Sequence, residues 1–321
     1  MKIPDEILCE IFSFLTHDDG KGLTLSCHRF HGLVKPPFQF APPRKLIFPT
    51  QGMTPHVIEI NKIKHVIDIA GNDIMSLPPE IGNLCSLTSL HISGNRLSSL
   101  PAEIGNLGNL VYLYINHNRI TRLPSEIGNL NRLTHLDINN NLLTSVPSEI
   151  CNMVSLRHLY IGRNQLTSLP RELGDLTNLI YLYVNNNQLT SLPAEIGNLN
   201  RLMHLYISNN QLASLPSEIG NLNQLISMYS DNNQLTSLPS EIGNLSNLTS
   251  LTLYNNLLSS VPSEMGNLSN IAYLYINNNR LTSLPSEIRN LRRLVFLNVI
   301  DNPLTLPSIL PEIRHLITNN I

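Results

Sequence analysis

The sequence predicts an α/β solenoid, a fold in which short units of equal length stack along one axis. Two sets of residues carry this prediction. Ten prolines recur at intervals of 23 residues, from Pro78 to Pro285, and eleven asparagines keep the same interval from Asn72 to Asn302. Self-similarity at a fixed period of this length is the signature of a repeat architecture.

One unit, residues 87–109, indicates how each repeat is built. Leu90 and Ile92 alternate with polar residues, as in a strand that has one buried face. Asn95 follows at a turn, where a carboxamide can both donate and accept hydrogen bonds with buried backbone groups. We therefore expect these asparagines to form a ladder that joins each unit to the next.

The segment 100–107 returns the chain to the next strand. Pro101 is expected to begin a short helical turn and Gly105 to end it. Three aliphatic residues of this segment are expected in the core: Leu100, Ile104 and Leu107. A single unit cannot bury its own apolar face, so the units must stack.

With its Leu-Pro-x-Glu-Ile-Gly-Asn-Leu return segment, the 23-residue period resembles the leucine-rich-repeat family in its intracellular type, over residues 63–316. The resemblance implies a curved, right-handed solenoid with a parallel β-sheet on its concave face and short helical or irregular segments on the convex side. Eleven strands ~4.8 Å apart would give an inner surface on the order of 50 Å long. We assign residues 63–321 to this solenoid and its C-terminal cap.

Strand residues between the buried aliphatics are expected on the concave face, and all ten tyrosines of the chain are predicted to lie there. Tyrosine offers a large, rigid contact area and is enriched at binding hot spots. The candidate partner-binding residues are Tyr112, Tyr114, His135, His158, Tyr160, Tyr181, Tyr183, His204, Tyr206, Tyr229, Tyr273 and Tyr275. The alternative for each tyrosine is that it only stabilises the sheet, where a cross-strand pair contributes roughly 0.2–1 kcal/mol.

One repeat departs from the pattern. Ser230 occupies a core aliphatic position between Tyr229 and Asp231. A polar residue there predicts a locally softened coil, and the alternative is a serine whose hydroxyl is satisfied by water.

No motif of an enzyme or a cofactor site occurs in the sequence. Adjacent strands would bring His135 and His158 close together, but no carboxylate or cysteine completes a metal-ligand set. We therefore expect no catalytic residue, no metal and no cofactor.

The charge balance of 21 Lys and Arg against 23 Asp and Glu argues against nucleic-acid or membrane partners. The four cysteines are scattered without disulfide or zinc spacing, which favours a reducing compartment. A cytoplasmic location is expected, with the nucleus as an alternative.

Residues 1–35 lack the 23-residue period and are predicted to form a separate helical module. Residues 3–15 have the spacing of an amphipathic helix, with Ile7, Ile11 and Leu15 on one face. The proline-rich residues 36–62 are predicted to be a semi-rigid linker and an N-terminal cap.

The segment Ile3–Leu15, with Leu25, Cys27, Arg29 and Phe30, resembles the F-box. In that family the helices dock on the small adaptor of cullin-RING ubiquitin ligases, and the C-terminal domain captures the substrate. The resemblance implies adaptor contacts at Pro4, Ile7, Leu8, Ile11 and Phe12.

Two functional hypotheses follow. The leading one is a non-enzymatic substrate receptor of an SCF-type E3 ubiquitin ligase, with the adaptor and cullin as partners and an unknown protein on the concave face. The alternative is a leucine-rich-repeat signalling scaffold of the small-GTPase-pathway type, in which the N-terminal helices act only as a cap.

Overall fold

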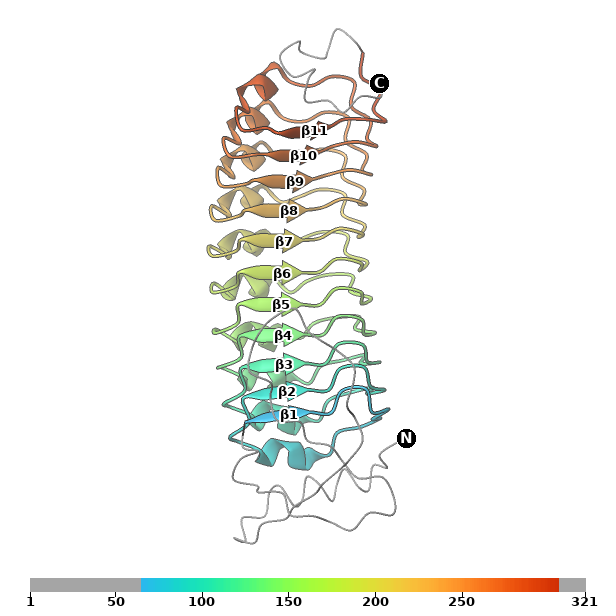
Figure 1. Ribbon diagram of the computed structural model, residues 1–321, viewed down its shortest axis with the longest axis vertical. Helices are drawn as coiled ribbons and strands as arrows, with labels where there is room; N and C mark the ends of the chain where they lie inside the picture. Colours follow the sequence, from blue (N-terminus) through green and yellow to red (C-terminus); the bar gives the residue numbers. More distant parts are fainter. Residues whose placement is uncertain (1–64, 306–321) are drawn as a thin grey trace.

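The computed structural model describes residues 65–305, which form a single stack of coils (Figure 1). Eleven three-residue strands make one parallel sheet in sequence order, as the number of asparagines predicts. The predicted helical module, the linker and the C-terminal cap lie outside the described residues. Within residues 65–305 no helix is long and apolar enough to cross a membrane.

The strands are β1 (Val66–Asp68), β2 (Ser89–His91), β3 (Tyr112–Tyr114), β4 (His135–Asp137), β5 (His158–Tyr160), β6 (Tyr181–Tyr183), β7 (His204–Tyr206), β8 (Ser227–Tyr229), β9 (Ser250–Thr252), β10 (Tyr273–Tyr275) and β11 (Phe296–Asn298). A second stack is made by short 3-10 helices of the return segments, which are η2 (Pro79–Asn83), η3 (Ala102–Asn106), η4 (Ser125–Asn129), η5 (Ser148–Asn152), η6 (Arg171–Asp175), η7 (Ala194–Asn198), η8 (Ser217–Asn221), η9 (Ser240–Asn244), η10 (Ser263–Asn267) and η11 (Ser286–Asn290).

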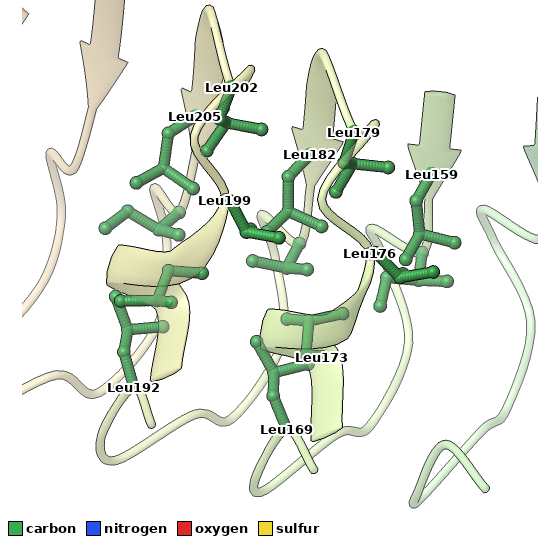
Figure 2. Packing of buried hydrophobic residues seen from close by; sticks show 14 of the residues in the cluster. Leu159, Leu169, Leu173, Leu176, Leu179, Leu182, Leu192, Leu199, Leu202 and Leu205 are labelled. Carbon is green, nitrogen blue, oxygen red and sulfur yellow. The ribbon is translucent and has the colours of Figure 1, made fainter. Parts of the chain in front are cut away.

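A continuous core of leucine and isoleucine side chains lies between the two stacks (Figure 2). The middle residue of every strand points into it, as Leu182 of β6 does. The core residues predicted in the return segment are confirmed, because Leu100, Ile104 and Leu107 are all buried. Each buried side chain contributes roughly 1.5–3 kcal/mol, and it does so only when the neighbouring coil covers it.

The predicted asparagine ladder is confirmed. In the central repeat the Oδ1 of Asn164 accepts a hydrogen bond from the backbone N–H of Leu143 at 3.0 Å. Its Nδ2 donates to the carbonyl oxygens of Ile138 and Ile161, each at 3.1 Å. Leu143 and Ile138 belong to the preceding coil, so one carboxamide satisfies buried backbone groups of two coils at once.

The role predicted for the return-segment glycine is wrong. Gly105 lies inside η3, which continues to Asn106 and is followed by Leu107. A Cβ atom at Gly105 would collide with the backbone carbonyl oxygen of Glu126 in the next coil. The glycine is therefore required by the close approach of successive return segments, and not by a chain reversal.

Ser230 is fully buried, and its hydroxyl donates to the carbonyl oxygen of Thr252 at 3.2 Å. Its backbone N–H donates to the same oxygen at 3.0 Å, and β8 and β9 keep the register of the other strands. A backbone carbonyl of the next coil therefore takes the place expected for water. The softened coil stays a prediction.

Candidate functional site on the sheet face

Each strand directs its first and third residues to the side opposite to the core, because successive side chains of a strand alternate between faces. We call this surface, over strands β2 to β11, the sheet face. Its first column consists of Ser89, Tyr112, His135, His158, Tyr181, His204, Ser227, Ser250, Tyr273 and Phe296. Its second column consists of His91, Tyr114, Asp137, Tyr160, Tyr183, Tyr206, Tyr229, Thr252, Tyr275 and Asn298.

The parallel register places equivalent residues side by side, and aromatic rings stack along both columns. In the first column, five rings from β3 to β7 form a continuous stack, which we call the first ladder. The separations of its ring centroids are 4.9 Å for Tyr112–His135, 4.1 Å for His135–His158, 4.7 Å for His158–Tyr181 and 4.4 Å for Tyr181–His204.

The second column carries a second ladder of four tyrosines from β5 to β8. The centroid separations are 4.8 Å for Tyr160–Tyr183, 3.9 Å for Tyr183–Tyr206 and 4.7 Å for Tyr206–Tyr229. Asp137 separates this ladder from the edge-to-face pair His91–Tyr114.

Stacking determines what the two ladders can offer to a partner. The ring faces lie against one another, so contact with a ligand falls to the tyrosine hydroxyls and imidazole nitrogens at the ring edges. Some of these already hydrogen-bond within the face, as His158 Nδ1 does with the Tyr160 hydroxyl at 3.3 Å. Most of the candidate residues are half-buried, while Tyr112 and Tyr273 are exposed. The sheet face is therefore a pre-ordered surface of hydrogen-bonding edges on an apolar base.

The histidines of the sheet face are held in their neutral form. Burial, together with the neighbouring His135 and Arg157, lowers the pKa of His158 to about 4. Burial also lowers the pKa values of His91, His135 and His204. These rings are uncharged at neutral pH, which permits the close His135–His158 stack.

Burial has the opposite effect on the tyrosines and raises the pKa of Tyr160 to about 12. The pKa of Tyr183 is also raised, first by burial and then by its hydrogen bond with Tyr206. These phenols stay protonated at neutral pH, so each keeps an O–H donor.

The structure places all twelve predicted residues on one face, with one correction about the tyrosines as a group. Tyr254, the one tyrosine outside the set of twelve candidates, lies two residues beyond the end of β9 and not on a strand. The predicted adaptor contacts at residues 4, 7, 8, 11 and 12 lie outside the described part of the chain.

A hollow at β9 was not predicted from the sequence. Both columns carry small residues there, Ser250 and Thr252, and the space above them measures about 530 Å³. The hollow is lined by Tyr229, Asp231, Thr249, Ser250, Thr252, Tyr254, Tyr273 and Tyr275. The signal in the sequence was the coincidence of two small residues in the same repeat.

No group of three or more His, Cys, Asp or Glu side chains in residues 65–305 is arranged to hold a metal ion. The pair with the closest imidazoles, His135 and His158, lies with its rings stacked 10° from parallel.

Models of leucine-rich repeats match most of the chain. A model described as "Leucine-rich repeat region" matches residues 54–139, 103–183, 146–236 and 171–260. A second, "Leucine rich repeat", matches residues 246–304. Both models describe repeats, and neither describes a catalytic domain.

Two solved structures at 30% identity resemble the chain. The plant peptide hormone receptor RGFR1, in complex with RGF2, is 30% identical with a TM-score of 0.66, over 76% of this chain and 45% of the receptor. PEPR1, in its structure with AtPEP1, is also 30% identical with a TM-score of 0.62, over 77% of this chain and 40% of that one. The chain thus spans less than half of the length of either protein.

A chain of the octameric complex of Latrophilin 3, Unc5D and FLRT2 shares the fold at 24% identity and a TM-score of 0.63. The match covers 75% of this chain and 76% of that one. No curated protein resembles the chain closely enough to count as a relative.

Proposed function

Because the chain belongs to the leucine-rich-repeat family, we propose that it is a non-enzymatic binding protein that captures another protein on its sheet face. The observation that carries this proposal is the pair of aromatic ladders on that face. Two proteins of similar fold, the plant peptide hormone receptor RGFR1 and PEPR1, are found with RGF2 and AtPEP1, which supports a protein or peptide as the partner.

The energetics of the ladders favour binding. Rings inside the ladders, such as Tyr183, are already held between two neighbours, so little side-chain entropy remains to be lost when a partner docks. The exposed edges then supply hydrogen bonds, while the half-buried rings supply contact area. A partner with a polar surface fits this combination, and its contacts would fall on the twelve candidate residues of the two columns.

We further propose that the captured protein is a substrate of an SCF-type ubiquitin ligase in the cytoplasm. This part rests on the F-box-like pattern of residues 1–35, which would bind the adaptor and, through it, the cullin. The chain itself would do no chemistry, because holding a substrate lysine beside a ubiquitin carrier is catalysis by proximity.

Affinity purification of the full-length protein from its own cells, with mass spectrometry of the captured proteins, tests both parts. Ile11→Asp combined with Phe12→Asp places charges on the apolar side of the first predicted helix and should remove adaptor and cullin only. Ser13→Asp, on the polar side of the same helix, is the matched control and should leave both bound. If the double variant still captures the adaptor, the ligase proposal is wrong.

The second arm addresses the sheet face. Tyr181→Asp puts a charge in the first ladder and should remove the other captured proteins while the adaptor stays. Val154→Asp adds the same charge at an exposed site between η5 and β5, away from the two columns, and should change nothing. Capture that survives Tyr181→Asp would refute binding on the sheet face.

A further inference from the structure

The second ladder stops where its next ring is missing. Tyr229 of β8, Thr252 of β9 and Tyr275 of β10 occupy equivalent positions in adjacent strands. Ring centroids along this ladder are 3.9–4.8 Å apart, so the small Thr252 leaves about two stacking steps between its tyrosine neighbours. One flat group fits this place, with a tyrosine on each side.

The first column does not close this place, because Ser227 and Ser250 are also small. Tyr254 and Tyr273 complete the wall of the hollow, and Tyr273 is 46% exposed. Among the described residues the aromatic contacts resume only at Tyr275, which packs on Phe296. The hollow therefore combines tyrosine walls with an opening toward solvent.

A buried carboxylate lies at the base of the hollow. Asp231 is 5% exposed, and its Oδ1 accepts hydrogen bonds from Ser208 Oγ at 2.7 Å and Thr252 Oγ1 at 2.9 Å. Its Oδ2 accepts one from Asn232 Nδ2 at 2.8 Å. The hydroxyl of Tyr254 also donates to Asp231; burial and this hydrogen bond raise the pKa of Tyr254.

All of these donors are neutral, so the negative charge of Asp231 has no cationic partner among them. Within residues 65–305 the ion pairs are Arg96–Asp73 and Arg171–Glu172, and neither involves Asp231. A buried charge is normally paired, and the field of the Asp231 carboxylate is weakly screened because the side chain itself is little exposed to water. This arrangement attracts a cation.

We propose that the hollow at β9 binds the guanidinium group of an arginine side chain of the partner protein. The inference rests on the proposed binding of a protein to the sheet face. A guanidinium is flat and stacks on aromatic faces, whereas an ammonium is compact and strongly hydrated. Because neutral donors already occupy most acceptor positions of Asp231, stacking and charge attraction hold the ligand, and no bidentate pair is required.

The test uses the full-length protein with ¹³C-labelled tyrosine rings and three small probes followed by NMR. The probes are the N-acetyl methylamides of arginine, lysine and citrulline. The arginine probe should shift the ring signals of Tyr229 and Tyr275 in a saturable way, with a Kd at least threefold below that of the lysine probe. Citrulline has the same shape without the charge and should cause no saturable shift.

Three variants sharpen the result. Asp231→Asn keeps an acceptor for Ser208 and Thr252 and should weaken the arginine probe tenfold or more. Thr252→Tyr restores the residue type of the neighbouring strands and should abolish binding by filling the place. Asp137→Asn removes another half-buried carboxylate of the sheet face, on β4, and should leave the Kd unchanged.

The proposal is overturned by an equal response to arginine and citrulline, by lysine binding as tightly as arginine, or by an unchanged Kd in Thr252→Tyr. The capture experiment separates this failure from a failure of the proposed function. Absence of arginine binding while Tyr181→Asp still loses the captured proteins would refute the hollow alone. Arginine binding with unchanged capture by Tyr181→Asp would instead refute the sheet face as the docking surface.

Discussion

The interior of the solenoid and its sheet face obey different rules, although both are built from the same repeats. In the interior, each ladder asparagine makes equivalent hydrogen bonds in one repeat after another, as Asn141, Asn164 and Asn187 do. On the sheet face, equivalent positions hold tyrosine, aspartate or threonine. The interior therefore defines the fold, and the sheet face is consequently free to vary in chemistry from repeat to repeat.

The largest loss of stability is expected from a substitution that removes hydrogen bonds in the interior. Asn164→Ala removes the acceptor of the Leu143 N–H and leaves that buried group without a partner. It also removes one of the two carboxamide donors to the carbonyl oxygen of Ile138, which keeps the hydrogen bond from Asn141. The unsatisfied buried N–H costs about 1–3 kcal/mol and each lost hydrogen bond to a carbonyl about 0.5–1.5 kcal/mol, so the free energy of unfolding should fall by about 3 kcal/mol. Urea unfolding followed by circular dichroism measures this difference.

The matched control for this prediction is Asn185→Ala. Asn185 belongs to the same central coils but is half-buried just past β6 on the sheet side. Its replacement should change the free energy of unfolding by less than about 0.5 kcal/mol. Equal losses in the two variants would contradict the distinction between interior and face.

The same distinction explains how much of the molecule was predictable from sequence. Buried positions repeat, so the period alone predicted the core, the eleven strands and the asparagine ladder. The packing role of Gly105 was missed because the clash it avoids lies in the next coil, with Glu126. The repeat period gives the number of residues in one unit, but it does not give the spatial distance between the return segments of successive units.

The hollow at β9 was missed for a related reason. The period places Thr252 and Ser250 on the sheet face, but a missing ring matters only when its neighbours on both sides are aromatic. The hydrogen bond from Thr252 to Asp231 joins residues 21 positions apart in consecutive coils. Such a site forms only when consecutive coils are stacked. It lies on the sheet face, where the residue in one repeat does not predict the residue at the same position in the next.

A smaller loss of stability is expected from a substitution that interrupts the stacked rings of the second ladder. Tyr183 stacks on Tyr206 at 3.9 Å and on Tyr160 at 4.8 Å, and an aromatic pair contributes about 0.5–1.5 kcal/mol. Tyr183→Ala should therefore lower the free energy of unfolding by about 1–2 kcal/mol, which is less than Asn164→Ala. Tyr273→Ala, at an exposed ring without an aromatic stacking partner in the described chain, is the control and should have a smaller effect. A loss at Tyr183 as large as that at Asn164 would mean that the ladders serve the fold.

The smallest expected effect is the pH dependence of stability that arises from His158 in the first ladder. The pKa of His158 is about 4 in the folded protein and 6.5 without the fold, so unfolding favours proton uptake between these values. Its contribution to stability is present above pH 6.5, is lost as the pH falls toward 4, and is constant below. The effect is modest because the ring is only half-buried and solvent screens its charge.

His158→Phe keeps a stacked ring without a titrating group, so its urea unfolding should depend less on pH between 6.5 and 4 than that of the natural protein. Asp137 contributes a slope of opposite sign, since burial raises its pKa, and the difference between variants is therefore the quantity to measure. His117→Asn is the control, because His117 is exposed at a left-handed position, φ 54°, where most repeats have asparagine. If His158→Phe keeps the full pH dependence, the neutral imidazole is not what holds the histidine stack together. In that case the backbone of the sheet would hold the rings of the first ladder in place. The order of the sheet face would then depend more on the interior than the stacking distances indicate.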